Sequence, residues 1–205
     1  MRLLRKLYDW VLHWAETPYG AGALFLLATA EASFFPIPPD PLLIALVLGA
    51  PVRAFRLALI CTLGSIGGAI IGYAIGYFAW WSSPGQFSPL AWFFFHHIPG
   101  FSVPLFETIQ KQFEDWNFWV IFTAGFTPIP YKVFTIAGGA CAINFPMFVF
   151  ASLVSRGARF FLVAALIWKF GAPITAFIDR YFNWLAFLFT ILLIGGFLVI
   201  RYVLS

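Results

Sequence analysis

Charged side chains are scarce in this chain. Of its 205 residues only 10% are Asp, Glu, Lys or Arg and 62% are apolar, whereas soluble domains carry about 25% charged residues. The mean hydropathy is +0.91. A core of this size cannot hide that much apolar surface from water, so much of it must face lipid. The composition excludes a disordered chain and an ordinary soluble enzyme, and it predicts an all-α integral membrane protein.

Cysteines are few, and dense basic tracts are missing. The 2 cysteines, Cys61 and Cys141, lie in apolar segments, which excludes a disulfide scaffold and favours small buried hydrophobes. The 12 Lys and Arg residues are scattered despite a net charge of +4, so we expect no nucleic-acid partner. His96 and His97 have no acid or thiol at ligand spacing, and we expect interfacial solvation rather than a metal site.

Catalytic motifs are absent as well. The sequence has no HExxH, no GxSxG, no pair of aspartates on one predicted helix and no nucleotide-binding motif. We therefore expect a protein that is not an enzyme and that uses neither a cofactor nor a metal.

Prolines divide the first apolar region. An apolar stretch containing Glu31 runs into the motif FFPIPPDP at 34–41, where Pro36 and Pro38 begin a break that no helix can continue through. The apolar run at 42–50 is too short to cross a bilayer, which needs about 20 residues. We predict a re-entrant hairpin whose broken backbone is covered by protein.

The same design recurs 92 residues later. FTPIPYK at 126–132 repeats FFPIPPD at 34–40, with breaks at Pro128 and Pro130, and a long apolar segment follows each motif. A hairpin returns to its own side whereas a long helix crosses, so the two halves must enter from opposite sides. This predicts an inverted repeat of two re-entrant helical hairpins, each followed by a long transmembrane helix. Chance recurrence in a Phe-rich and Pro-rich chain is the alternative.

We divide the chain into five parts of a single membrane domain. They are an interfacial helix (1–17), repeat one (18–81), a polar loop with an amphipathic helix (82–116), repeat two (117–170) and a last transmembrane helix (182–204). The first part is amphipathic and is interrupted by Asp9, His13 and Glu16, which argues against a signal peptide.

Glycines mark one face of the long segment in repeat one. Gly64, Gly68, Gly72 and Gly76 recur every four residues, a spacing that lets another helix approach closely. Random placement of glycine in a tolerant membrane helix is the alternative.

Basic residues give an orientation. One side of the predicted topology carries Arg2, Arg5, Lys6, Arg53, Arg56, Lys169 and Arg180, and the other carries Lys111 and Arg201. The excess places the N-terminus in the cytoplasm.

The motifs resemble a known family. SFFPIPPD at 33–40, GFTPIPYKVFTIAGGA at 125–140 and SRGARF at 155–160 are similar to the DedA family of the VTT-domain (SNARE-associated Golgi protein) superfamily, most of all to its YqaA-like branch. The resemblance covers residues 18–170. It implies a multi-pass protein of the bacterial inner membrane that translocates a polyprenyl phosphate or phospholipid with proton coupling.

The resemblance also implies roles for individual residues. Family acids near the first hairpin match Glu31 and Asp40, and later basic residues match Arg156 and Arg159. The usual pattern has one arginine just before the second motif and one after it. Here Gly125 stands at the first place, and a lysine, shifted by one residue to 132, stands at the second.

Five ionisable residues fall in segments expected to be embedded: Glu31, Asp40, Lys132, Arg156 and Arg159. Each costs about 2.5–3.5 kcal/mol or more at a helix centre, which makes it a functional candidate. We expect the three cations to bind an anionic headgroup and the two acids to carry protons. Asp40 and Lys132 occupy equivalent positions and are expected to approach each other. The alternative is that the charges only neutralise one another and pin the hairpins.

Three functions remain open from the sequence. The first is a translocase (flippase) or scramblase of a lipid phosphate, whose partner is a membrane lipid. The second is a proton- or cation-coupled transporter of a small solute, and the third is a non-catalytic membrane assembly factor or an intramembrane enzyme. A homo-oligomer is compatible with each of them.

Overall fold

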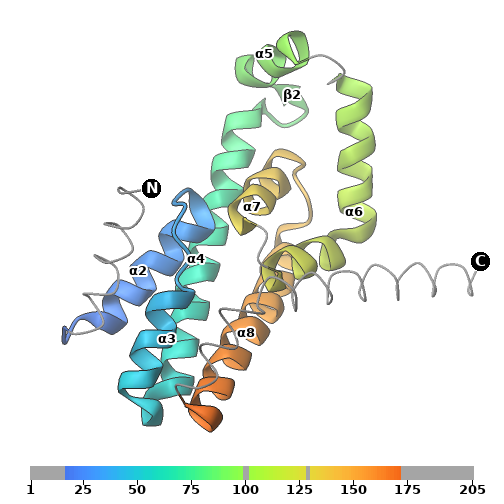
Figure 1. Ribbon diagram of the computed structural model, residues 1–205. Coiled ribbons are helices and arrows are strands. Elements are labelled where there is room, and N and C mark those ends of the chain that lie inside the picture. Colours follow the sequence, from blue (N-terminus) through green and yellow to red (C-terminus); the bar gives the residue numbers. More distant parts are fainter. Residues whose placement is uncertain (1–16, 99–101, 128–129, 172–205) are drawn as a thin grey trace, which may run out of the picture.

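The computed structural model describes residues 17–98, 102–127 and 130–171, which form a bundle of helices with one small hairpin (Figure 1). The elements are α2 (Gly20–Ser33), α3 (Asp40–Gly49), the 3-10 turn η2 (Pro51–Arg53), α4 (Ala54–Trp80), β1 (Trp81–Ser83), β2 (Gln86–Phe87), α5 (Pro89–His97), α6 (Val103–Phe126), α7 (Tyr131–Ala140) and α8 (Phe145–Phe170). The helices predicted at 1–17 and 182–204 lie, apart from Thr17, outside the described residues.

Two helical stretches are long and apolar enough to span a membrane: Pro51–Trp80, which joins η2 to α4, and Phe145–Phe170. Of the four helices that flank the proline breaks, α6 has 24 residues, and the other three arms are shorter: α2 has 14 residues and α3 and α7 have 10 each. At 1.5 Å per residue these arms reach about 15–21 Å, against about 30 Å of bilayer hydrocarbon.

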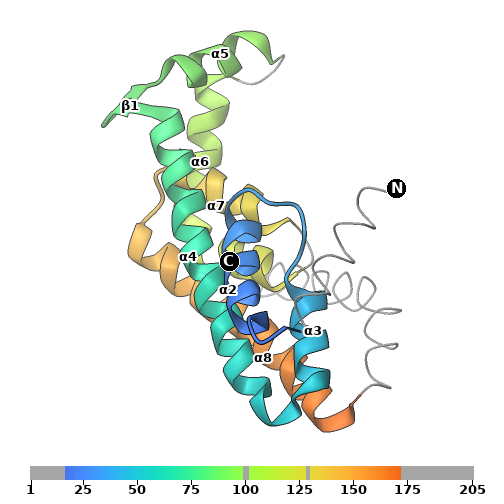
Figure 2. The same cartoon turned by 90° about the vertical axis from the view of Figure 1, so that its left-hand side faces the viewer.

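Glycines on α4, which runs along most of the length of the molecule (Figure 2), let this helix pack closely against neighbouring helices. A Cβ at Gly68 would overlap the carbonyl oxygen of Thr29 on α2, and one at Gly76 would overlap that of Ile136 on α7. A Cβ at Gly139 would overlap the carbonyl of Tyr73 in return. The predicted packing of the glycine face within the chain is confirmed, and this one face serves both α2 and α7.

Two apolar clusters fill the bundle. The first joins α2 and α3 to the first part of α4 and the last part of α8, with Leu24, Leu43 and Phe160 fully buried. The second joins α6 and α7 to the first part of α8 around Tyr131 and Phe148. Buried Cys61 and Cys141 belong to these clusters as free thiols, as predicted.

The region predicted as a polar loop is more structured than expected. β1 and β2 form a two-stranded antiparallel hairpin, a small exception to the all-α prediction. Ser88 caps α5 by accepting a bond from the Ala91 amide, and Trp81 Nε1 donates to the Ala140 carbonyl at 2.8 Å. The hairpin is therefore tied to the end of α7.

The boundary predicted at 116/117 was wrong. α6 is one hydrogen-bonded helix from Val103 to Phe126, although Figure 1 shows that it changes direction along its length. No proline or glycine lies between Pro104 and Gly125, so nothing there ends a helix. The change from an amphipathic to an apolar pattern at 116/117 therefore marks a change in what surrounds α6, and the helix itself continues.

Helix bounds recur with the spacing of the two motifs. Adding 92 to the bounds of α3 gives 132–141, and α7 occupies 131–140. Adding 92 to the bounds of α4 gives 146–172, and α8 occupies 145–170. A short helix followed by a long helix therefore occurs twice within the described residues, at the spacing of the two proline motifs.

Candidate functional site

Two buried ion pairs join the first half of the chain to the second. Arg156 Nη2 donates to Glu31 Oε2 at 2.6 Å. Arg159 Nη2 lies 3.0 Å from each carboxylate oxygen of Asp40, and its Nε lies 3.2 Å from Oδ1. Only 3% and 8% of the arginine side chains are exposed, against 13% and 15% for Glu31 and Asp40. Glu31 and Asp40 are thus each neutralised by an arginine of α8.

Arg156 is held from several sides. Its Nε donates to Ser65 Oγ on α4 at 2.7 Å, and its guanidinium carbon lies 5.0 Å from the Tyr131 ring centroid and 4.6 Å from that of Phe160. Cation–π contacts of this kind stabilise a desolvated cation. Tyr131 is itself fixed by donating to Ser152 Oγ at 2.6 Å. These contacts fix the guanidinium plane in place.

Arg159 connects the two proline breaks. Asp40, which it binds, begins α3 directly after the first break. Its Nη1 also donates to the carbonyl of Thr127 at 2.8 Å, directly before the second break. One side chain therefore holds the start of α3 and the end of α6 together.

Lys132 behaves differently from the arginines. It is half-buried, and its Nζ donates to the carbonyl of Phe35 at 3.2 Å. The predicted approach of Lys132 to Asp40 was wrong, because Asp40 binds the planar fork of Arg159, which reaches both carboxylate oxygens at once. In a continuing helix the Phe35 carbonyl would accept a bond from the amide of residue 39, but Pro39 has no amide proton, so this carbonyl needs another donor.

The two breaks lie next to each other. Besides the Lys132 bond, Thr135 Oγ1 of α7 donates to the Ala32 carbonyl near the end of α2 at 3.0 Å. Of the four prolines predicted as breaks, Pro36 and Pro38 lie between α2 and α3 and Pro130 directly precedes α7, whereas Pro128 is outside the described residues. All five predicted ionisable residues therefore lie around the junction of the hairpins.

The glycine that departs from the DedA pattern has a packing role. A Cβ at Gly125 would overlap Ser155 Oγ of α8. A larger residue at position 125 would require Ser155 to move, and within the described residues the guanidinium groups of the site come from Arg156 and Arg159.

Sequence reasoning missed the groups that hold the arginines. Ser65, Tyr131 and the Thr127 carbonyl were not singled out, although a serine beside Gly64 was a usable signal for a polar contact on α4. His96 and His97 are exposed on α5 and bond through Nδ1 to carbonyls of their own helix. Across the described residues, no group of three or more His, Cys, Asp or Glu could hold a metal ion.

Two bacterial proteins are similar to the chain over most of its length. A protein of Haemophilus influenzae is 38% identical over 168 residues, which are 81% of each chain. A protein of Histophilus somni is 33% identical over 201 residues, which are 98% of this chain and the whole of the relative. The chain belongs to the family of these two proteins. Both carry the name uncharacterized protein. No protein-family model and no solved structure matches the chain.

Proposed function

We propose that the protein is a bacterial inner-membrane transporter that translocates a lipid phosphate, with proton coupling. The observation that carries the proposal is the set of two buried acid–arginine pairs at the junction of the proline breaks. Ionisable residues inside membrane segments are costly and by default mark a pathway for a charged cargo.

A membrane location is supported by the surfaces of the long helices. Large apolar side chains are exposed along α4 and α8, among them Leu59, Leu63, Phe78, Phe150 and Leu162. Such a surface is unfavourable in water and suited to lipid. Both relatives come from bacteria, in keeping with the proposed inner membrane.

An inverted repeat is supported by reciprocal packing. α2 packs on α4 as α6 packs on α8, and α7 packs on α4 as α3 packs on α8. In each half, the helix before the break packs on the long helix of its own half, and the helix after the break packs on the long helix of the other half. A pseudo-twofold axis between the halves would produce this arrangement. Transporters built in this way bind cargo between discontinuous segments near the membrane midplane.

The ion pairs provide a chemical link between cargo and protons. A phosphate headgroup must compete with Glu31 and Asp40 for the guanidinia. Arginine binds phosphate in the same bidentate geometry that Arg159 uses for Asp40. A carboxylate displaced by the cargo is left buried without a partner, and taking up a proton removes that cost. Cargo binding and proton uptake are thereby coupled.

Reconstitution in liposomes tests the proposal. The purified chain in phosphatidylcholine liposomes should move a fluorescent polyprenyl phosphate between leaflets, faster when a pH gradient is applied. The double variants Glu31→Gln with Arg156→Gln and Asp40→Asn with Arg159→Gln remove both charges of a pair and strand neither. We expect both to lose translocation while remaining folded, and Lys111→Gln on α6 to retain it.

Other outcomes identify the other functions. Full translocation by both double variants would mean that the pairs only pin the hairpins. Uptake of a small solute under a pH gradient, without lipid movement by the unaltered chain, would favour the solute transporter.

A further inference from the structure

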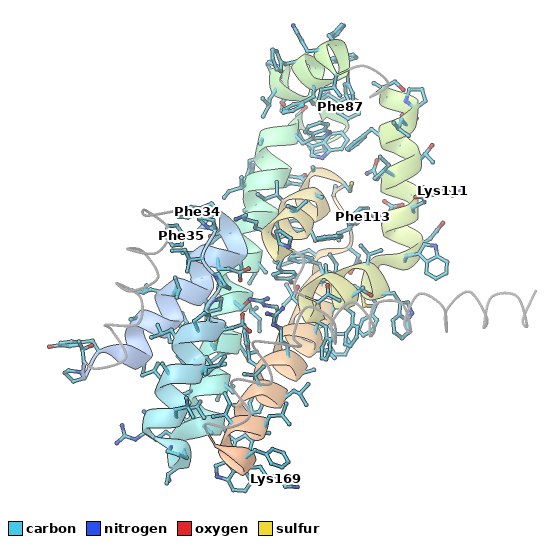
Figure 3. All side chains as sticks on the ribbon, in the orientation of Figure 1. Phe34, Phe35, Phe87, Lys111, Phe113 and Lys169 are labelled. Carbon is cyan, nitrogen blue, oxygen red and sulfur yellow. The ribbon has the colours of Figure 1, made fainter. Side chains whose placement is uncertain are left out.

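One end of the molecule carries exposed cations on two neighbouring helices. Arg53 ends η2, Arg56 lies in the first turn of α4, and Lys169 lies in the last turn of α8. All three are exposed, and η2 contacts α8 at this end (Figures 1 and 3). None of the three takes part in the ion pairs of the described residues, which both lie at the site.

The described carboxylates lie elsewhere. Glu31 and Asp40 are occupied at the site. Glu107, Glu114 and Asp115 belong to α6, which Figure 3 places, with its labelled Lys111, away from Lys169. Within the described part of the chain, this end is therefore a positively charged surface.

Aromatic rings connect the two helices between these cations. The Phe55 ring centroid lies 5.8 Å from that of Trp168 and 6.3 Å from that of Phe161. Phe55 is 46% exposed and Trp168 is 55% exposed. Arg56 follows Phe55 in the sequence and Lys169 follows Trp168, so each exposed ring has a cation as its neighbour.

We infer that Phe55, Arg56, Trp168 and Lys169 form a binding site for an anionic phospholipid of the leaflet at this end. Aromatic rings favour the level of the headgroups, and basic side chains attract an anionic headgroup there. The exposed rings favour a lipid over a soluble phosphate, because acyl chains would cover the rings and a soluble phosphate would leave them bare. The site is separate from the buried ion pairs. The inference rests on the proposed membrane location but not on transport.

A melting experiment on the purified full chain tests the site. Phosphatidylglycerol is titrated into phosphatidylcholine–detergent micelles, and the melting temperature gives the half-saturating fraction of phosphatidylglycerol. A basic residue near an anionic surface contributes about 1 kcal/mol, or about fivefold in affinity. We expect Arg56→Gln and Lys169→Gln each to raise the half-saturating fraction about fivefold, and the double variant to raise it further.

Two controls make the result decisive. Lys111→Gln removes an exposed cation from α6 and should leave the response unchanged. The melting temperature in phosphatidylcholine alone reports any folding defect separately. An unchanged response in the double variant, or an equal response of the unaltered chain to both lipids, overturns the site. Because no transport is measured, a failure of lipid translocation in liposomes leaves this result standing.

Discussion

α4 and α8 hold equivalent places in the two halves but meet their neighbours in different ways. At an offset of 92 residues, Arg156 corresponds to Gly64 and Arg159 to Gly67. The glycine face of α4 lets the backbones of α2 and α7 each come into direct contact with the backbone of α4. The arginines of α8 reach across to carboxylates at α2 and α3. One long helix supplies close packing, and the other supplies charge.

The difference shows how two similar halves come to depend on each other. The acids belong to the first half and the arginines to the second, so neither half alone can neutralise its buried charges. An uncompensated buried charge is strongly destabilising. The opposite charges therefore favour assembly of the halves in one arrangement, in addition to any role in transport.

The largest effect is expected on the charged helix. Arg156→Gln leaves Glu31 buried without its partner, and we expect a loss of about 3–5 kcal/mol in the free energy of unfolding. Denaturant unfolding in detergent micelles measures it. The double variant with Glu31→Gln should recover most of the loss. Equal instability of the single and double variants would show that the pair contributes nothing to the fold.

Next in size is the hydrogen bond by which α4 holds Arg156. Ser65→Ala removes the acceptor for Arg156 Nε, and hydrogen bonds to charged groups contribute about 1.5–3 kcal/mol. Thr62→Val is the matched control, because the Thr62 hydroxyl donates only to the Ala58 carbonyl of its own helix. We expect the serine variant to be clearly less stable than the threonine variant in the same unfolding assay. Equal stability would mean that Arg156 does not need α4.

The close packing of α4 against α2 can be tested with two adjacent glycines of α4. Gly68→Ala places a Cβ against the Thr29 backbone, and overpacking of this kind costs about 1–3 kcal/mol. Gly67→Ala meets nothing within 4 Å and should be neutral or slightly stabilising, since alanine is the better helix former. Melting temperatures in detergent compare them. Equal melting temperatures would contradict the close contact with α2.

Much of this arrangement was predictable from the sequence. Proline clusters, apolar lengths and the 92-residue offset predicted the breaks, the short apolar run of α3, and the ends of the two repeats at 81 and 170, where α4 and α8 end to within one residue. A proline ends a helix through its own backbone, and the length of an apolar segment and the recurrence of a motif can be counted along the chain. A single sequence is therefore enough to predict these features.

Pairing of side chains was not predictable in the same way. The offset places Asp40 and Lys132 at equivalent positions, which suggested that they meet. Which cation reaches Asp40 depends on how α8 is rotated and on the reach of Arg159, and periodicity alone determines neither. The β1–β2 hairpin and the continuity of α6 were missed because polarity was taken as the boundary of the elements.

The smallest effect expected is the coupling between Asp40 and Lys132. Neither an ion pair nor a hydrogen bond joins them, since Asp40 binds Arg159 and Lys132 binds the Phe35 carbonyl. Changes at residues without shared partners usually add to within about 0.3–0.5 kcal/mol. We therefore expect the unfolding free energies of Asp40→Asn and Lys132→Gln to be additive in the double variant.

The matched cycle uses the partner that the structure gives to Asp40. Asp40→Asn combined with Arg159→Gln should be non-additive by about 0.5–3 kcal/mol, because each single change leaves a buried charge that the second one removes. Both cycles are measured by denaturant unfolding in the same detergent. A coupling to Lys132 as large as that to Arg159 would mean that the two halves are joined through α7 as well as α8. If the Asp40–Lys132 cycle is additive and the Asp40–Arg159 cycle is not, α8 is the helix that neutralises Asp40. The contrast between the charged α8 and the glycine face of α4 then holds.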